Sequence, residues 1–100
     1  MWWFRPSFKK KFERIKGGWS CSQVRQLLGP PTEAEDTGVP LGSTWGTQHA
    51  LTYKIRAGDP VRQWMFEVDG QFHYIWFAKV SHDDIDPWRV TLKKRVPRRL

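Results

Sequence analysis

The stretch from Ile15 to Pro31 limits the possible folds most, because it contains both a start signal and a stop signal for one short helix. Ser20 is a typical N-cap, and Gln23, three residues later, completes a capping box with it. Gly29 and the two prolines after it end the helix. The apolar residues at spacings i, i+3 and i+4 are Val24, Leu27 and Leu28. A helix of about nine residues is marginal alone, so we expect this apolar face to pack against the rest of the chain.

The same stretch resembles the signature of the SmpA/OmlA family, the small BamE-like outer-membrane lipoproteins. The corresponding residues are Ile15, Gly18, Ser20, Gln23, Val24, Leu27, Leu28, Gly29 and Pro31, with Trp19 where the family has methionine. The resemblance continues more loosely through Tyr53 and the hairpin 66–72, and covers about residues 12–78. It implies the fold of the β-lactamase-inhibitor-protein modules and a non-catalytic role in supporting an envelope protein assembly.

The residues before and after this stretch predict the remaining elements. Ser7 can cap a second helix over about 7–16, with Phe8, Phe12 and Ile15 on one face. The glycine- and proline-rich segment from Pro30 to Gly46 is typical of a long loop. Alternating apolar residues then predict three strands, at His49–Arg56, Val61–Val68 and Gln71–Val80. The predicted fold class is α+β, with two short N-terminal helices packed on a three-stranded antiparallel meander, in the order ααβββ.

The register of the hairpin across Asp69-Gly70 decides which side chains share a face of the sheet. A two-residue loop would place Trp64 and Phe66 with His73, Ile75 and Phe77. A three-residue loop would instead place Trp64 and Phe66 with Phe72, Tyr74 and Trp76, beside the apolar residues of the first strand. We favour the three-residue loop because it builds one continuous apolar side for the helices to cover. The opposite face then predicts a partner-binding surface, made of Met65, His73, Ile75 and Phe77.

The net charge of +7 is concentrated at the two ends. Residues 1–16 carry +5 and residues 89–100 carry +6, whereas residues 17–88 carry −4. We therefore divide the chain into a basic aromatic segment 1–16, a domain 17–80 and a basic tail 81–100. In the tail, Trp88, Val90 and Leu92 alternate as in a short strand, which could cover the second sheet face. An external partner on that face is the alternative.

Two candidate sites for anionic partners follow from this charge distribution. The N-terminal aromatic and basic residues are typical of a membrane-interface anchor, or else the rings fold back onto the core: Trp2, Trp3, Arg5, Lys9, Lys10 and Lys11. The basic tail, with Trp88 before it, could bind nucleic-acid phosphates or remain a solvated tail.

Catalytic and metal-binding patterns are weak in this sequence. His82, Asp83, Asp84 and Asp86 lack the turning glycine and alternating spacing of known cation loops, so a solvated acidic loop is expected. His49 and His73 have no second ligand at metal-binding spacing, and no histidine is tied to the single cysteine, Cys21. We expect no enzyme activity, no catalytic residue, no metal, no cofactor and no small-molecule substrate.

The sequence therefore predicts a non-catalytic protein-interaction module whose main partner is another protein. The alternative is a small basic protein that binds nucleic acid or a membrane surface. The chain has no apolar run of the roughly 18 residues that a membrane-spanning helix needs, and it shows neither a signal peptide nor a lipidation box. As it stands the sequence favours a cytoplasmic or membrane-peripheral location, whereas the family resemblance implies the cell envelope.

Overall fold

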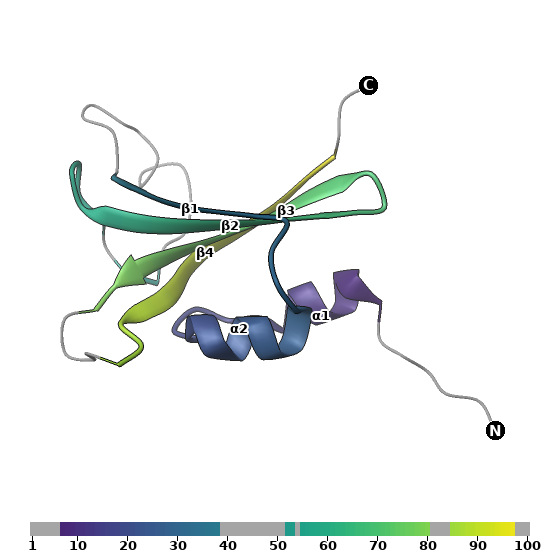
Figure 1. Cartoon of the computed structure of the whole chain (residues 1–100), viewed down its shortest axis with the longest axis horizontal. Coiled ribbons are helices and arrows are strands. Elements are labelled where there is room, and N and C mark those ends of the chain that lie inside the picture. The colour runs from purple at the N-terminus through teal and green to yellow at the C-terminus, as the bar shows by residue number, and fades with distance from the viewer. Residues whose placement is uncertain (1–6, 39–51, 54, 81–84, 98–100) are drawn as a thin grey trace.

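Two helices lie against one face of a four-stranded antiparallel sheet in the computed structural model (Figure 1). The structure describes residues 7–38, 52–53, 55–80 and 85–97. Its elements are α1 Phe8–Arg14, α2 Cys21–Leu28, β1 Glu33–Gly38, β2 Pro60–Val68, β3 Gln71–Lys79 and β4 Trp88–Pro97. The strands follow one another across the sheet in the order β1-β2-β3-β4. The α+β class is thus confirmed, but the sheet has four strands where we predicted three.

Both helices form where the local sequence predicts them. Ser7 caps α1 by accepting a hydrogen bond from the backbone N–H of Lys10. In α2 the capping box is complete, because the Gln23 N–H donates to Ser20 Oγ at 3.2 Å and the Ser20 N–H donates to Gln23 Oε1 at 2.9 Å. Gly29 ends the helix with a φ of 83°, a conformation that glycine adopts without strain.

β1 lies inside the segment that we predicted to be a loop, so that prediction is wrong over residues 33–38. All six of its residues are exposed, and the strand pairs with β2 from Glu33 opposite Met65 to Gly38 opposite Pro60. An edge strand that buries no side chain needs no apolar alternation, which explains why the sequence pattern misses it. Half of the predicted strand 49–56 lies outside the described residues, and its four described residues, 52, 53, 55 and 56, are not part of a strand. The Thr52 N–H donates to the Thr91 carbonyl at the edge of β4.

The β2–β3 hairpin has the two-residue loop, so the three-residue loop that we favoured is wrong. Val68 lies opposite Gln71, and the register continues through Phe66 opposite His73. Asp69 and Gly70 have φ values of 51° and 73°. Positive φ at both turn residues matches the right-handed twist of two strands joined by a two-residue turn. The observed register differs by one residue from the one that we favoured. Every β3 side chain therefore lies on the opposite face from the predicted one.

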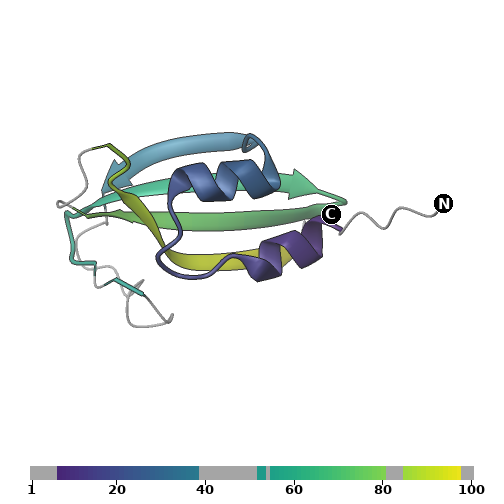
Figure 2. The same ribbon diagram turned by 90° about the horizontal axis from the view of Figure 1, so that it is seen from below.

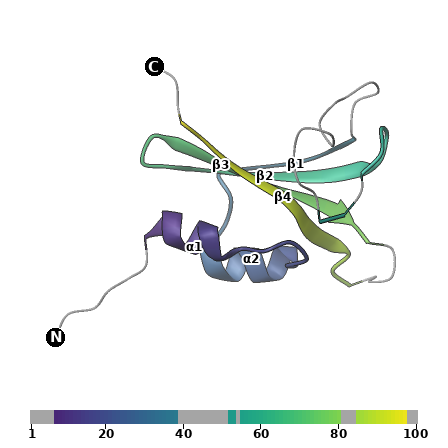
Figure 3. The ribbon, with the colours of Figure 1, turned by 180° about the vertical axis from the view of Figure 1, so that it is seen from behind.

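The core fills the space between the helices and the sheet. Its buried residues are Phe12, Ile15, Cys21, Val24, Trp64, Phe66, Ile75, Phe77, Trp88 and Val90. Helix α1 crosses β4, and α2 lies over β1 and β2 (Figure 2). The described parts of segments 1–16, 17–80 and 81–100 all contribute to this one core. Figure 3 shows the same two layers from behind.

A β-bulge in β4 decides which of its side chains enter the core. Trp76 lies opposite Leu92, but the next β3 residue, Phe77, lies opposite Val90, so Thr91 is the extra residue. Trp88 and Val90 therefore point into the core, and Leu92 points to the other face. Their simple alternation in the sequence had suggested one shared face. Rather than covering the second face of the sheet, β4 extends the sheet at its edge.

Candidate interaction surfaces

The four residues of the predicted partner surface are buried in the structure. Ile75 and Phe77 are 0% exposed and His73 is 3% exposed, because the two-residue turn directs all three toward the helices. Met65 lies on the opposite face and is itself 7% exposed. These four residues are therefore not brought together, and our assignment of the two sheet faces was reversed on β3.

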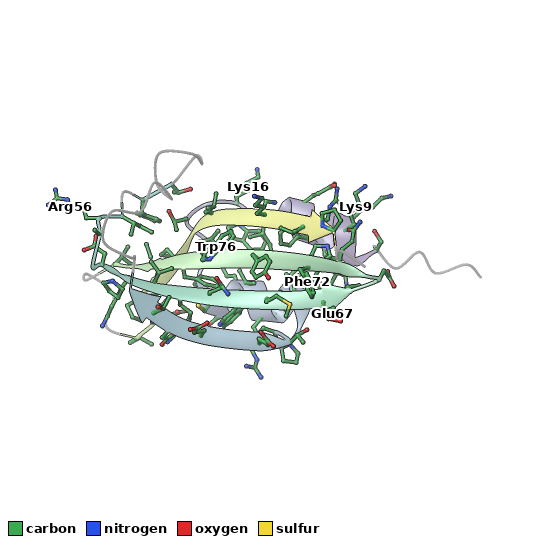
Figure 4. The ribbon with its side chains drawn as sticks, turned by 90° about the horizontal axis from the view of Figure 1, so that it is seen from above. Lys9, Lys16, Arg56, Glu67, Phe72 and Trp76 are labelled. Carbon is green, nitrogen blue, oxygen red and sulfur yellow. The ribbon has the colours of Figure 1, made fainter. Side chains whose placement is uncertain are left out.

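The β3 residues that we expected in the core, Phe72, Tyr74 and Trp76, instead line the face of the sheet opposite the helices. We define the aromatic face as Met65, Phe72, Tyr74, Trp76, Leu92 and Val96. Figure 4 looks onto this face, with Phe72 and Trp76 in front of the sheet and the helices behind it. Apart from Met65, these side chains are half-buried rather than covered. The Asp69-Gly70 dipeptide favours a two-residue turn, and a prediction based on that turn would have placed these β3 side chains on this face.

Side-chain contacts along β3 hold the aromatic rings in place. The Tyr74 and Trp76 rings are stacked, with centroids 5.5 Å apart and planes 11° apart. The Phe72 ring lies 6.4 Å from the Tyr74 ring at 51°. Trp76 Nε1 donates to Gln63 Oε1 on β2 at 2.9 Å. The face is therefore an ordered apolar surface, and a partner would need to restrict few side-chain rotations on binding it.

Charge is distributed unequally across this face. One row of directly opposed residues runs from β1 to β4: Glu33, Met65, Tyr74 and Lys94. Glu33 and Lys94 are both exposed. Among the described residues, neither forms an ion pair. The row is acidic at the β1 edge, apolar in the middle and basic at the β4 edge.

A second candidate surface lies where α1 meets β4. We define the basic edge as the exposed cations Lys9, Lys10, Arg14, Lys16, Lys94 and Arg95. Lys9 and Lys16 project beyond the β4 edge of the sheet (Figure 4). Lys11, which we predicted to belong to the N-terminal anionic-partner site, is half-buried on α1. The other members of the predicted N-terminal site, Trp2, Trp3 and Arg5, lie outside the described residues.

Lys93 joins the two basic segments. Its Nζ donates to the carbonyl oxygens of Phe12 at 2.7 Å and Glu13 at 3.0 Å, in the last turn of α1. The ammonium also lies 5.2 Å from the centroid of the Phe12 ring. Burial lowers the pKa of this ammonium. A positive charge at the C-terminal end of a helix is favourable, so Lys93 fixes α1 to β4 and brings the N-terminal cations beside those of β4.

Cys21 and His73 are both core residues. Cys21 is 8% exposed, and burial raises the pKa of its thiol to about 11, although Arg62 Nη1 lies 4.0 Å from the sulfur. His73 lies between α1 and the sheet, where burial lowers the pKa of its imidazole. At neutral pH the Cys21 thiolate is therefore scarce, and neither side chain is open to a substrate.

No group of three or more metal-ligating side chains occurs among the described residues. His49, His82, Asp83 and Asp84 lie outside them, and Asp86 accepts a hydrogen bond from Ser22 Oγ at 2.9 Å. A shallow pocket on α2 is open to solvent and lined by Trp19, Gln23, Gln26 and Leu27.

No protein-family model, curated protein or solved structure matches this chain. Neither of the two described helices is long and apolar enough to cross a membrane.

Proposed function

We propose that this protein is a non-catalytic protein-interaction module and that the aromatic face is its contact surface. This proposal rests on three aromatic side chains that follow one another along β3 on the sheet face opposite both helices: Phe72, Tyr74 and Trp76. A sheet packed on one side usually presents polar side chains on its other side. Tyrosine and tryptophan are enriched at the centres of protein interfaces, where they provide much of the binding free energy.

The cellular role follows from the resemblance to the SmpA/OmlA family. Within that proposal the module supports a protein assembly in the cell envelope. The capped α2 and the 66–72 hairpin are the parts of the chain that carry the resemblance, and the aromatic face adjoins that hairpin. A cytoplasmic or membrane-peripheral adaptor would use the same surface.

Site-specific photo-crosslinking in the source cell tests this function. A photoreactive phenylalanine analogue at position 74 or 76 should capture one defined protein, whereas the same analogue at Ile85, which is 97% exposed, should not. Tyr74→Ser and Trp76→Ser should lose that protein in co-purification while the far-ultraviolet circular dichroism remains that of the folded chain. Equal capture at positions 74 and 85 would contradict the proposal.

A second candidate function is binding of an anionic macromolecule at the basic edge. The specific observation is that Lys93 fixes α1 beside β4, which joins the two basic segments of the sequence on one side of the molecule. A single-stranded oligonucleotide and anionic vesicles are suitable probes. Oligonucleotide affinity should fall steeply as salt rises, whereas vesicle binding that involves tryptophan should partly persist.

Charge reversal locates such binding on the molecule. Lys9→Glu should weaken binding of either probe. Lys79→Glu makes the same kind of change at an exposed lysine near the opposite end of the sheet and should have a smaller effect. Equal losses in both variants would indicate a general charge effect and exclude the basic edge as a site.

A further inference from the structure

One row of residues across the aromatic face is electrostatically complementary to itself, and the exposed Glu67 on β2 lies on the same face opposite Phe72. In the row Glu33, Met65, Tyr74, Lys94, the acidic residue is on β1 and the basic residue is on β4. In the reverse direction, from β4 to β1, the same row begins with the basic residue and ends with the acidic one. The neighbouring row also starts from an exposed acid on β1 and ends on an apolar β4 residue: Glu35, Gln63, Trp76 and Leu92.

Two copies of such a face that pack with their strands aligned can pair unlike charges in only one symmetric way. Sheets that pack face to face lie about 10 Å apart, with strand directions within about 30° of each other. A two-fold axis parallel to the strands places β1 of one copy over β4 of the other, so Glu33 meets Lys94 twice. A two-fold axis across the strands places β1 over β1, and the exposed glutamates then repel one another.

We propose that the aromatic face binds the same face of a second copy of this chain, about a two-fold axis parallel to its strands. The inference rests on the proposed function, because it names a partner for the proposed contact surface. Tyr74 and Trp76 on β3 of each copy then lie over Met65 and Gln63 on β2 of the other. Complementary charges at the β1 and β4 edges fix the orientation.

The face is smaller than most stable protein interfaces. The strands have six, nine, nine and ten residues, and at about 4.8 Å between strands and about 3.3 Å per residue they form a face of about 540 Å² per copy. Stable protein interfaces usually bury about 800 Å² per partner. The dimer is therefore expected to be weak and to dissociate on dilution.

Sedimentation of the full chain over a range from micromolar to millimolar concentration is the test. We expect a concentration-dependent monomer–dimer equilibrium. Glu33→Lys alone and Lys94→Glu alone should each raise the dissociation constant by about tenfold or more, which corresponds to about 1.4 kcal/mol per tenfold. The double variant Glu33→Lys with Lys94→Glu restores both unlike pairs and should recover most of the lost affinity. Lys79→Glu, which lies off the face, is the matched control.

A chain that stays monomeric at every concentration would overturn the dimer. So would a double variant no better than the two single variants, or a Lys79→Glu variant that dissociates as readily as Lys94→Glu. A monomer that still loses its crosslinked protein on Trp76→Ser refutes the dimer and leaves the proposed function standing. If Trp76→Ser folds and changes neither self-association nor capture, both proposals are wrong.

Discussion

Arg62 on β2 binds Asp36 on β1 through two hydrogen bonds, from Nε to Oδ1 at 2.8 Å and from Nη2 to Oδ2 at 3.0 Å. The same guanidinium lies 4.5 Å from the centroid of the Trp88 ring. A planar cation can bind a carboxylate with two parallel bonds and contact a ring at the same time. This pair therefore ties the exposed edge strand β1 to the core.

Acid should weaken this connection. The Arg62 guanidinium holds the pKa of the Asp36 carboxyl below its usual range. A carboxyl whose pKa is lowered by folding stabilises the fold fully above its unfolded pKa, about 4, and this stabilisation is lost as pH falls through the folded pKa. Because the Asp36 side chain is 56% exposed, we expect less than about 1 kcal/mol. Thermal denaturation of Asp36→Asn should differ from wild type at pH 7 and converge with it in acid. A difference that is independent of pH would contradict this.

His73 is a second acid-sensitive contact, between α1 and the sheet. Its ring meets the Phe8 and Phe12 rings edge-on, with centroids 4.8 Å and 5.0 Å away. Its Nδ1 lies 3.3 Å from the Phe66 carbonyl oxygen, to which an N–H there donates. Protonation would place an imidazolium between two phenylalanine rings.

The free energy of unfolding should therefore decrease below neutral pH. Burial lowers the pKa of the His73 imidazole and the hydrogen bond with the Phe66 carbonyl opposes this, while positive Arg95 lowers the pKa further and Asp69 raises it. A base with a lowered folded pKa stabilises the fold fully above its unfolded pKa, about 6.5, and that stability declines as pH falls toward the folded pKa. Urea unfolding between pH 5 and 8 should show this decline in wild type and less of it in His73→Phe. An unchanged slope in His73→Phe would assign the effect to another group.

Truncation of two neighbouring residues on β3 should destabilise the fold to different extents. Ile75 is fully buried beneath the helices, and Ile75→Ala should cost about 2–5 kcal/mol of the free energy of unfolding. Tyr74 is half-buried on the aromatic face, so Tyr74→Ala should cost less. Urea unfolding of both variants measures the difference. If Tyr74→Ala were the more destabilising variant, the hairpin register would be the one that we first favoured.

The capping box should stabilise α2 by a measurable amount. Ser20→Ala removes the N-cap oxygen and should cost about 0.5–2 kcal/mol. Gln23→Ala removes the reciprocal acceptor and should cost about 0.5–1.5 kcal/mol. The two losses should be non-additive in a double-mutant cycle, because they share one structure. Gln26→Ala, at an exposed glutamine of the same helix, is the control and should be nearly neutral. Additive losses would show that the box does not act as a unit.

The structure corrects the sequence-based predictions mainly at the sheet. The Asp69-Gly70 dipeptide predicts a hairpin, but the choice between two loop lengths rested on which face looked more apolar. That criterion failed because both faces of β3 are rich in aromatic and aliphatic residues, with Phe72, Tyr74 and Trp76 on one and Ile75 and Phe77 on the other. The conformation of the turn residues decides between them, and it overrides the apolar pattern.

The sequence alone determined the two helices, their caps and the existence of the hairpin, because each depends on residues within a few positions of one another. Only the tertiary structure decided that residues 33–38 form an edge strand, that Thr91 forms a bulge, and that Tyr74 and Trp76 face away from the helices. It also brought the two basic segments together through Lys93 and Phe12. Each of these features depends on pairing between segments far apart in the chain, where a local pattern fits more than one arrangement.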